Sequence, residues 1–192
     1  MGLDTNRAER PRVERPGSVI GIVVADFHAE LTGAMADSAE RELIECGVDE
    51  DDILRVHVPG AFEIPIVASR LAESAEVDAV LCFGLILKGE TDHDRHVAEG
   101  CVQGIMRASL DAGVPIHFGV LTCATMEQAR ARALPPELDE GEGAMLGDAI
   151  RAVARREDVR RTDVRRTDKG REVARAAIET LLALDEVLEL TK

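Results

Sequence analysis

The residues best suited to chemistry lie in the segment from Gly84 to His96, GLILKGETDHDRH. An apolar run ends at Gly89, and the residues Glu90 to Asp92 offer oxygen atoms that cap the start of a helix. His93 stands just inside that start. Backbone amides at a helix N-terminus attract anions such as phosphate, and an imidazole exchanges protons near neutral pH. The segment therefore predicts an anion-binding turn with an acid–base group beside it.

Other chemistries are less well supported by the residues. His93 and His96 would share one face of a helix, but no distant group with metal-ligand spacing accompanies them, so we expect no metal. Cys123, at the end of a later apolar run, has the side chain of a nucleophile, although a small buried thiol is the commoner role. No GxGxxG or GxxxxGK[ST] motif follows the first apolar run, which argues against dinucleotide-binding and P-loop proteins. We expect no cofactor.

Composition and charge narrow the class of protein. The chain has 192 residues, enough for one domain with a sizeable core, and 45% of them are hydrophobic. A net charge of −14 argues against nucleic acid and anionic membranes as partners. The acidic, lysine-poor composition is explained equally by adaptation to salt and by a bias toward Ala and Arg. The four cysteines lack CxxC spacing, and neither a secretory signal nor a membrane-length apolar run is present, so we expect a cytoplasmic location.

The elements that position these residues alternate between strands and helices. Residues 1–17 are polar, and we expect a flexible lead-in there, followed by a single domain over 18–192. Each predicted strand is a buried apolar run that precedes a helical pattern. These strands are Ser18–Ala25, Ile53–Val58, Ala79–Leu87 and Ile116–Leu121. The alternation predicts an α/β fold in which a four-stranded parallel sheet lies between helices on both faces.

The candidate residues collect at one edge of this predicted sheet. In open parallel sheets, ligands bind beyond the carboxyl ends of the strands. Phe27, the turn at Ala61–Glu63, the turn at Lys88–His93 and the segment after Thr122 all follow strand ends. We therefore expect the binding site at the carboxyl edge of the sheet.

An insert at 134–167 interrupts the alternation. It opens with Pro135-Pro136, passes through an acidic stretch that contains glycine, and then repeats the pentapeptide DVRRT from Asp158 and from Asp163. We interpret the Arg-rich part as a charged helix or loop. Asp168 follows the insert and is suited to cap a last helix. The apolar face of that helix holds Val173, Ala177, Leu181 and Leu184.

Four segments together resemble the lumazine synthases, the enzymes that make 6,7-dimethyl-8-ribityllumazine in riboflavin biosynthesis. The segments are VPGAFEIP (Val58–Pro65), GLILKGETDH (Gly84–His93), GVPIHFGVLT (Gly113–Thr122) with MEQARARA (Met126–Ala133), and DKG (Asp168–Gly170). Each segment alone is a weak signal, but their order and their places in the strand–helix units are specific. The resemblance implies a flavodoxin-like, three-layer α/β/α sandwich. It also implies a transferase that condenses 5-amino-6-(D-ribitylamino)uracil with 3,4-dihydroxy-2-butanone 4-phosphate.

The resemblance implies a set of residues that bind the pyrimidine substrate. Phe27 matches the aromatic residue that stacks on the ring, and an aromatic face suits a flat heterocycle. Ala61, Phe62 and Glu63 match the turn that holds the ribityl chain and the ring, with Glu63 accepting hydrogen bonds from hydroxyl groups. The strand residues whose backbone lines the uracil would be Leu85, Ile86 and Leu87.

The resemblance implies a second set of residues for the butanone phosphate. Glu90 and Thr91 match the turn that binds the phosphate, and His93 matches the catalytic histidine that transfers protons. Phe118 and Arg132 match residues that a neighbouring subunit contributes, the Phe to the ring pocket and the Arg to the phosphate. We expect the Glu90 carboxylate to lie away from the phosphate, whose binding then falls to the backbone amides.

The insert marks a departure from the family pattern. Lys169 matches a substrate-binding lysine before the last helix, yet it lies 37 positions after Arg132 (169 − 132), where roughly ten or fewer are usual. In the family this joint lies where pentamers pack into icosahedral shells. We therefore expect a homo-oligomer in which a pentamer is favoured over a 60-subunit shell.

Two alternative functions fit the same kind of fold. One is an archaeal-type riboflavin synthase, which would use lumazine itself as the substrate. The other is a non-catalytic flavin-binding or shell protein, which becomes the better interpretation if the insert displaces Arg132.

Overall fold

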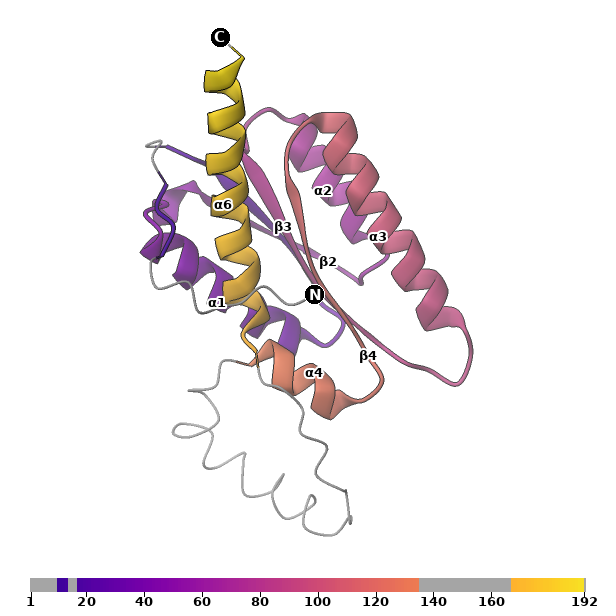
Figure 1. The fold of residues 1–192 in the computed structure, drawn as a ribbon. Helices are drawn as coiled ribbons and strands as arrows, with labels where there is room; N and C mark the ends of the chain where they lie inside the picture. The colour runs from indigo at the N-terminus through magenta and orange to yellow at the C-terminus, as the bar shows by residue number, and fades with distance from the viewer. Residues whose placement is uncertain (1–9, 14–16, 135–166, 192) are drawn as a thin grey trace.

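A computed structural model describes residues 10–13, 17–134 and 167–191. Four parallel strands form one sheet in the order β2-β1-β3-β4 (Figure 1). The strands are β1 (Ile20–Ala25), β2 (Ile53–Val58), β3 (Ala79–Leu87) and β4 (Ile116–Cys123). The α-helices are α1 (Ala29–Glu45), α2 (Ile64–Glu73), α3 (His93–Ala112), α4 (Met126–Ala133) and α6 (Lys169–Leu190), and a short 3₁₀ turn spans Glu50–Asp52.

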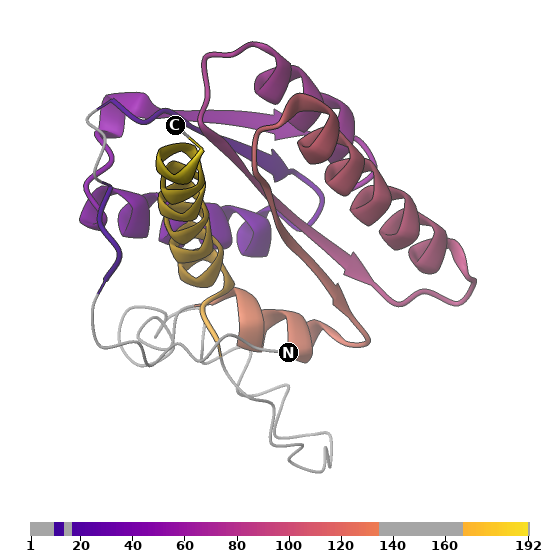
Figure 2. The same ribbon diagram turned by 45° about the horizontal axis from the view of Figure 1, so that its top comes forward.

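The helices cover both faces of the sheet. Figures 1 and 2 show α1, α4 and α6 on one face and α2 with α3 on the other. Two apolar cores correspond to these faces, and neighbouring residues of β1 alternate between them: Ile22 and Val24 pack toward α1 and α6, whereas Val23 and Ala25 pack toward α2 and α3. The predicted three-layer, flavodoxin-like α/β fold is confirmed.

The boundaries of the elements lie close to those expected from the apolar runs. β1 begins at Ile20, two residues later than predicted, and β4 continues to Cys123, whose carbonyl accepts the N–H of Lys88 at 2.9 Å. Helix α4 covers the whole MEQARARA segment, Met126–Ala133. Asp168 caps α6 as expected, because its side chain accepts a hydrogen bond from the N–H of Arg171.

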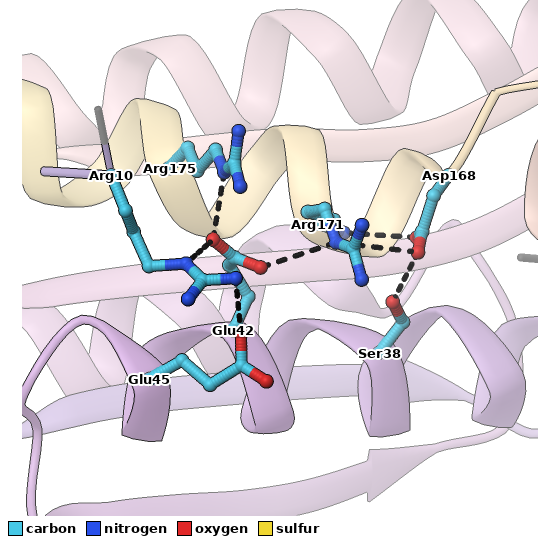
Figure 3. A network of polar contacts seen from close by, with 7 residues as sticks. All are labelled: Arg10, Ser38, Glu42, Glu45, Asp168, Arg171 and Arg175. Carbon is cyan, nitrogen blue, oxygen red and sulfur yellow. Dashed lines mark hydrogen bonds and ion pairs between the residues drawn. The ribbon is translucent and has the colours of Figure 1, made fainter. Parts of the chain in front are cut away.

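A buried carboxylate joins α1, α6 and the N-terminal segment (Figure 3). Glu42 of α1 is 1% exposed, and its Oε1 accepts hydrogen bonds from Nε of Arg175 at 2.7 Å and from Nε of Arg10 at 2.9 Å. Nε of Arg171 forms an ion pair with Oε2 at 3.1 Å, without hydrogen-bond geometry. Arg10 also pairs with Glu45. This network fastens α6 along α1.

Most of the predicted lead-in and insert lies outside the described residues. Within the lead-in, Val13 donates its N–H to the carbonyl of Cys46 at 2.9 Å, so this part of the chain lies against the end of α1. Only Leu134 and Thr167 of the insert are described. No helix in the described part of the chain is long and apolar enough to cross a membrane.

Candidate active site

A cleft of about 490 Å³ lies beyond the carboxyl ends of β1 and β3. The chain leaves β1 toward β2 on one side and returns to form β3 on the other side of β1. Such a reversal of strand order opens a crevice in which ligands bind in α/β folds. Most of the predicted site residues line this cleft: Phe27, Ala61, Phe62, Glu63, Leu85, Ile86, Leu87, Thr91 and His93.

The turn after β1 presents the ring of Phe27. Backbone pairing with the segment after β2 continues past the sheet, since the N–H of Phe27 donates to the carbonyl of Pro59 at 3.1 Å. His28 adopts a left-handed conformation (φ 65°), which turns the chain sharply from β1 into α1. Its ring meets that of Phe27 edge to face, with 4.4 Å between centroids. Phe27 remains 65% exposed, so it offers a free ring face to a ligand.

The turn before α2 forms the opposite wall of the cleft. The N–H of Glu63 donates to the carbonyl of Gly60 at 3.3 Å, and α2 begins at the next residue. Gly84 of β3 lets the start of α2 approach the sheet closely, because a Cβ there would lie 3.1 Å from Cδ1 of Ile64. The ring of Phe62 is 62% exposed. Two exposed phenyl rings, Phe27 and Phe62, therefore line one cleft beside the end of β3.

The turn after β3 leads into α3 as the sequence suggested, but with different capping. Asp92 makes no side-chain cap, and the hydroxyl of Thr91 accepts a hydrogen bond from the N–H of His93 at 3.4 Å. The N–H of Gly89 donates to Oδ1 of Asp94 at 3.5 Å, and Asp94 also lines the cleft. Sequence reasoning missed Asp94, whose only local signal is an acidic residue in the first helical turn. Glu90 is exposed and is not among the cleft residues.

The cleft as built by one chain carries acidic groups. Glu63 and Asp94 line it, and none of the described lining residues is Lys or Arg. A phosphate group is held most firmly by amides together with a guanidinium, which binds it bidentately. Among the described residues of one chain, the lining of the cleft would therefore offer a bound phosphate no cation.

Besides Glu90, three more of the predicted site residues lie outside this cleft. Phe118 is on the edge strand β4 and is 40% exposed. Arg132 is exposed on the last turn of α4. Burial raises the pKa of Cys123, and the positive charge of Arg132 partly offsets this rise. Lys169 begins α6 and donates a hydrogen bond to Glu172. Phe118 and Arg132 are accessible to another copy of the chain.

Other candidates from the sequence do not form sites. Cys123 is buried, and the raised pKa keeps it as a thiol, which is a poor nucleophile. His96 is exposed on α3 and does not line the cleft. Among residues 10–13, 17–134 and 167–191, no group of three His, Cys, Asp or Glu is arranged to hold a metal ion.

Comparison with known proteins adds independent evidence. The sequence model of the family described as 6,7-dimethyl-8-ribityllumazine synthase matches residues 17–185. A 6,7-dimethyl-8-ribityllumazine synthase from Levilactobacillus brevis is 43% identical over 121 residues, which are 63% of this chain and 76% of that protein. A protein of the same description from Salinibacter ruber is 41% identical over 117 residues, 61% of this chain and 75% of its own length.

Proposed function

The chain belongs to the 6,7-dimethyl-8-ribityllumazine synthase family, and we propose that the cleft beyond β1 and β3 is its active site. The protein is a lumazine synthase, a transferase of riboflavin biosynthesis. It condenses 5-amino-6-(D-ribitylamino)uracil with 3,4-dihydroxy-2-butanone 4-phosphate and releases lumazine, phosphate and water. The alternative functions considered from the sequence are not favoured by these comparisons.

The pyrimidine occupies the aromatic part of the cleft in this proposal. Phe27 stacks on the heterocycle with its exposed ring face, and Phe62 borders the same space. The backbone at Leu85–Leu87 ends β3 at the floor of the crevice and offers amide and carbonyl groups to the uracil edge. Ala61 and Glu63 hold the ribityl chain, with the carboxylate accepting hydrogen bonds from its hydroxyl groups.

One observation supports a role for Arg132 in phosphate binding: none of the described residues that line the cleft is Lys or Arg. The turn at Glu90 and Thr91 binds the phosphate through backbone amides, and a cation must come from elsewhere. Arg132 is exposed outside the cleft of its own chain. We therefore assign it to the phosphate in the cleft of a neighbouring subunit, with Phe118 beside the ring. A role for Lys169 in substrate binding has weaker support, because its amine already donates a hydrogen bond to Oε2 of Glu172 at 2.5 Å.

His93 transfers protons in the proposed mechanism. The amine of the pyrimidine attacks the ketone carbon, and water leaves as the imine forms. His93 then assists the proton transfers that accompany elimination of phosphate. The ribitylamino nitrogen attacks the remaining carbonyl carbon, which closes the second ring and releases a second water. The cleft contributes the alignment of the two substrates, which converts an encounter of two molecules into a reaction within one complex.

Family membership implies a homo-oligomer, and we propose a pentamer with active sites between subunits. The insert at 134–167 begins two positions after Arg132, and we infer that it disfavours packing of pentamers into a 60-subunit shell. Light scattering should give about 104 kDa, five times the chain mass of 20.7 kDa. A particle above a megadalton would overturn this part of the proposal. We also propose a cytoplasmic location, which all four cysteines support by being free and buried.

Mixing the purified protein with both substrates tests the function directly. The fluorescence of lumazine should rise together with released phosphate, and the chain has no Trp or Tyr to obscure the signal. Lumazine supplied alone should give no riboflavin. Formation of riboflavin from lumazine alone would instead identify a riboflavin synthase, and no change in either mixture would favour a non-catalytic role.

A further inference from the structure

The last turn of α4 is closed by a residue from far along the chain. The final carbonyls of a helix have no donor within the helix. In α4 the carbonyl of Arg130 accepts the N–H of Leu134 at 3.1 Å, and the carbonyl of Ala131 accepts the N–H of Thr167 at 2.9 Å. Thr167 lies 36 positions after Ala131 (167 − 131) and directly before the capping residue of α6. This hydrogen bond therefore joins the two ends of the insert, and its acceptor, Ala131, directly precedes Arg132.

Asp168 connects this closure to two further helices (Figure 3). Its Oδ1 accepts the N–H of Arg171 at 3.0 Å, which caps α6. Its Oδ2 accepts the hydroxyl hydrogen of Ser38 on α1 at 2.6 Å. The side chain of Asp168 is 8% exposed, so these hydrogen bonds are sheltered from water. Through the dipeptide Thr167-Asp168, α4 is tied to both α6 and α1.

Helix α4 depends on such ties because it is short. It has eight residues, and the side chains it buries in the core, Ala129 and Ala133, are small. Its first turn is capped by Thr125, whose hydroxyl accepts the N–H of Gln128 at 3.3 Å. An isolated helix of this length is unstable in water, so the position of its last turn follows from its caps and its neighbours.

We propose that Asp168 is a positioning residue for Arg132, an inference that rests on the proposed function of Arg132 in phosphate binding. Asp168 fixes Thr167 against the end of α4, and this holds the turn that carries Arg132 at a set distance from α1 and the sheet. A guanidinium binds phosphate bidentately only in a narrow geometry, so a small displacement weakens the contact. The anchoring also explains how Arg132 keeps its place next to a long insert.

The Michaelis constants of the two substrates test the inference. Asp168→Ala should raise the KM for butanone phosphate about tenfold, with the KM for the pyrimidine and kcat at saturation changed less than about twofold. Asp168→Asn should restore most of the affinity, because Asn caps helices as well as Asp and can donate to the Ser38 hydroxyl. Ser38→Ala, which leaves the cap of α6 intact, should raise the same KM by about threefold.

Two outcomes would overturn the inference. If Asp168→Ala lowers only the melting temperature and leaves both KM values unchanged, Asp168 is merely structural. If Asp168→Ala does not fold, Ser38→Ala decides, and an unchanged KM for butanone phosphate in that variant rejects the positioning role. Arg132→Ala in the same assay separates the two proposals. An unchanged KM in Arg132→Ala removes Arg132 from the site, whereas a raised KM there with none in the Asp168 and Ser38 variants rejects only the positioning role.

Discussion

Glu42 on α1 and Arg175 on α6 form a part-buried ion pair, with 2.7 Å between Oε1 and Nε, although 133 positions separate them. The carboxylate is 1% exposed and also faces Arg10 and Arg171 (Figure 3). A buried carboxylate is stable only when paired charges and hydrogen bonds replace its lost hydration. This pair therefore holds α6, and with it the Thr167-Asp168 closure of α4, in a fixed place on the sheet.

Glu42→Gln should lower the free energy of unfolding by about 2 kcal/mol. Removal of the charge leaves guanidinium groups with reduced compensation, and their partial exposure keeps the loss below that of a fully buried pair. Urea denaturation followed by far-UV circular dichroism measures the change. Glu45→Gln is the matched control, because Glu45 pairs with Arg10 from an exposed position and should cost less than about 0.5 kcal/mol. Equal effects of the two changes would contradict the role of burial.

The stability of the fold should fall in mild acid because of His117. Burial lowers the pKa of this β4 residue to about 4, and its Nε2 has no hydrogen-bond partner among the described residues. The unfolded chain binds the proton more tightly, so this contribution to stability is complete above about pH 6.5 and is lost as pH falls toward 4. Between pH 7 and pH 4, the wild type should lose about 3 kcal/mol more than His117→Leu. Parallel pH curves for the two proteins would show that His117 is not responsible.

His93→Ala should slow turnover about 10²-fold and change both KM values less than about threefold, since proton transfer is lost while the binding surfaces remain. Steady-state kinetics of lumazine formation measure this split. His96→Ala is the control, because His96 lies on the same helix, is exposed and is outside the cleft. It should stay within about twofold of the wild type. An unchanged kcat in His93→Ala would remove His93 from the mechanism.

The insert should be dispensable for catalysis. The N–H of Thr167 donates to the carbonyl of Ala131, which lies about one helical turn before Leu134. A linker of about four residues in place of 135–166 is therefore long enough to join Leu134 to Thr167. The shortened protein should keep kcat and both KM values within about threefold. If the insert disfavours a shell, light scattering should also show particles heavier than a pentamer. Loss of the affinity for butanone phosphate would show that the insert itself contributes to the site.

Continuous apolar runs made the sheet and its helices predictable. Strands such as β3 are buried on both faces, and a short continuous apolar run between turn residues is typical of such strands. Phe27, Thr91 and His93 lie in turns that directly follow predicted strands, so their position at the carboxyl edge of the sheet could be predicted as well. Periodicity identifies the apolar face of α6, but it does not predict that Leu184 on that face is 41% exposed. Figure 1 shows that the C-terminal end of α6 extends beyond the sheet.

Long-range polar contacts were beyond prediction. Glu42 has the sequence context of a surface residue, since its partners lie 32 and 133 positions away. The bond from Thr167 to Ala131 likewise has no local pattern, because the capped helix and its cap are separated by the insert. Asp94 resembles any acidic residue of a first helical turn until the cleft is assembled around it.

A complementation assay tests most directly whether the active site is shared between subunits. His93→Ala protomers still offer Arg132, and Arg132→Ala protomers still offer His93. In co-expressed mixed oligomers, roughly a quarter of the clefts combine an intact His93 with an intact Arg132 from a neighbour. At low butanone phosphate, the mixed oligomers should regain roughly a quarter of wild-type lumazine formation, well above either variant alone. Activity equal to the average of the two separate variants would contradict a site completed by the neighbouring subunit.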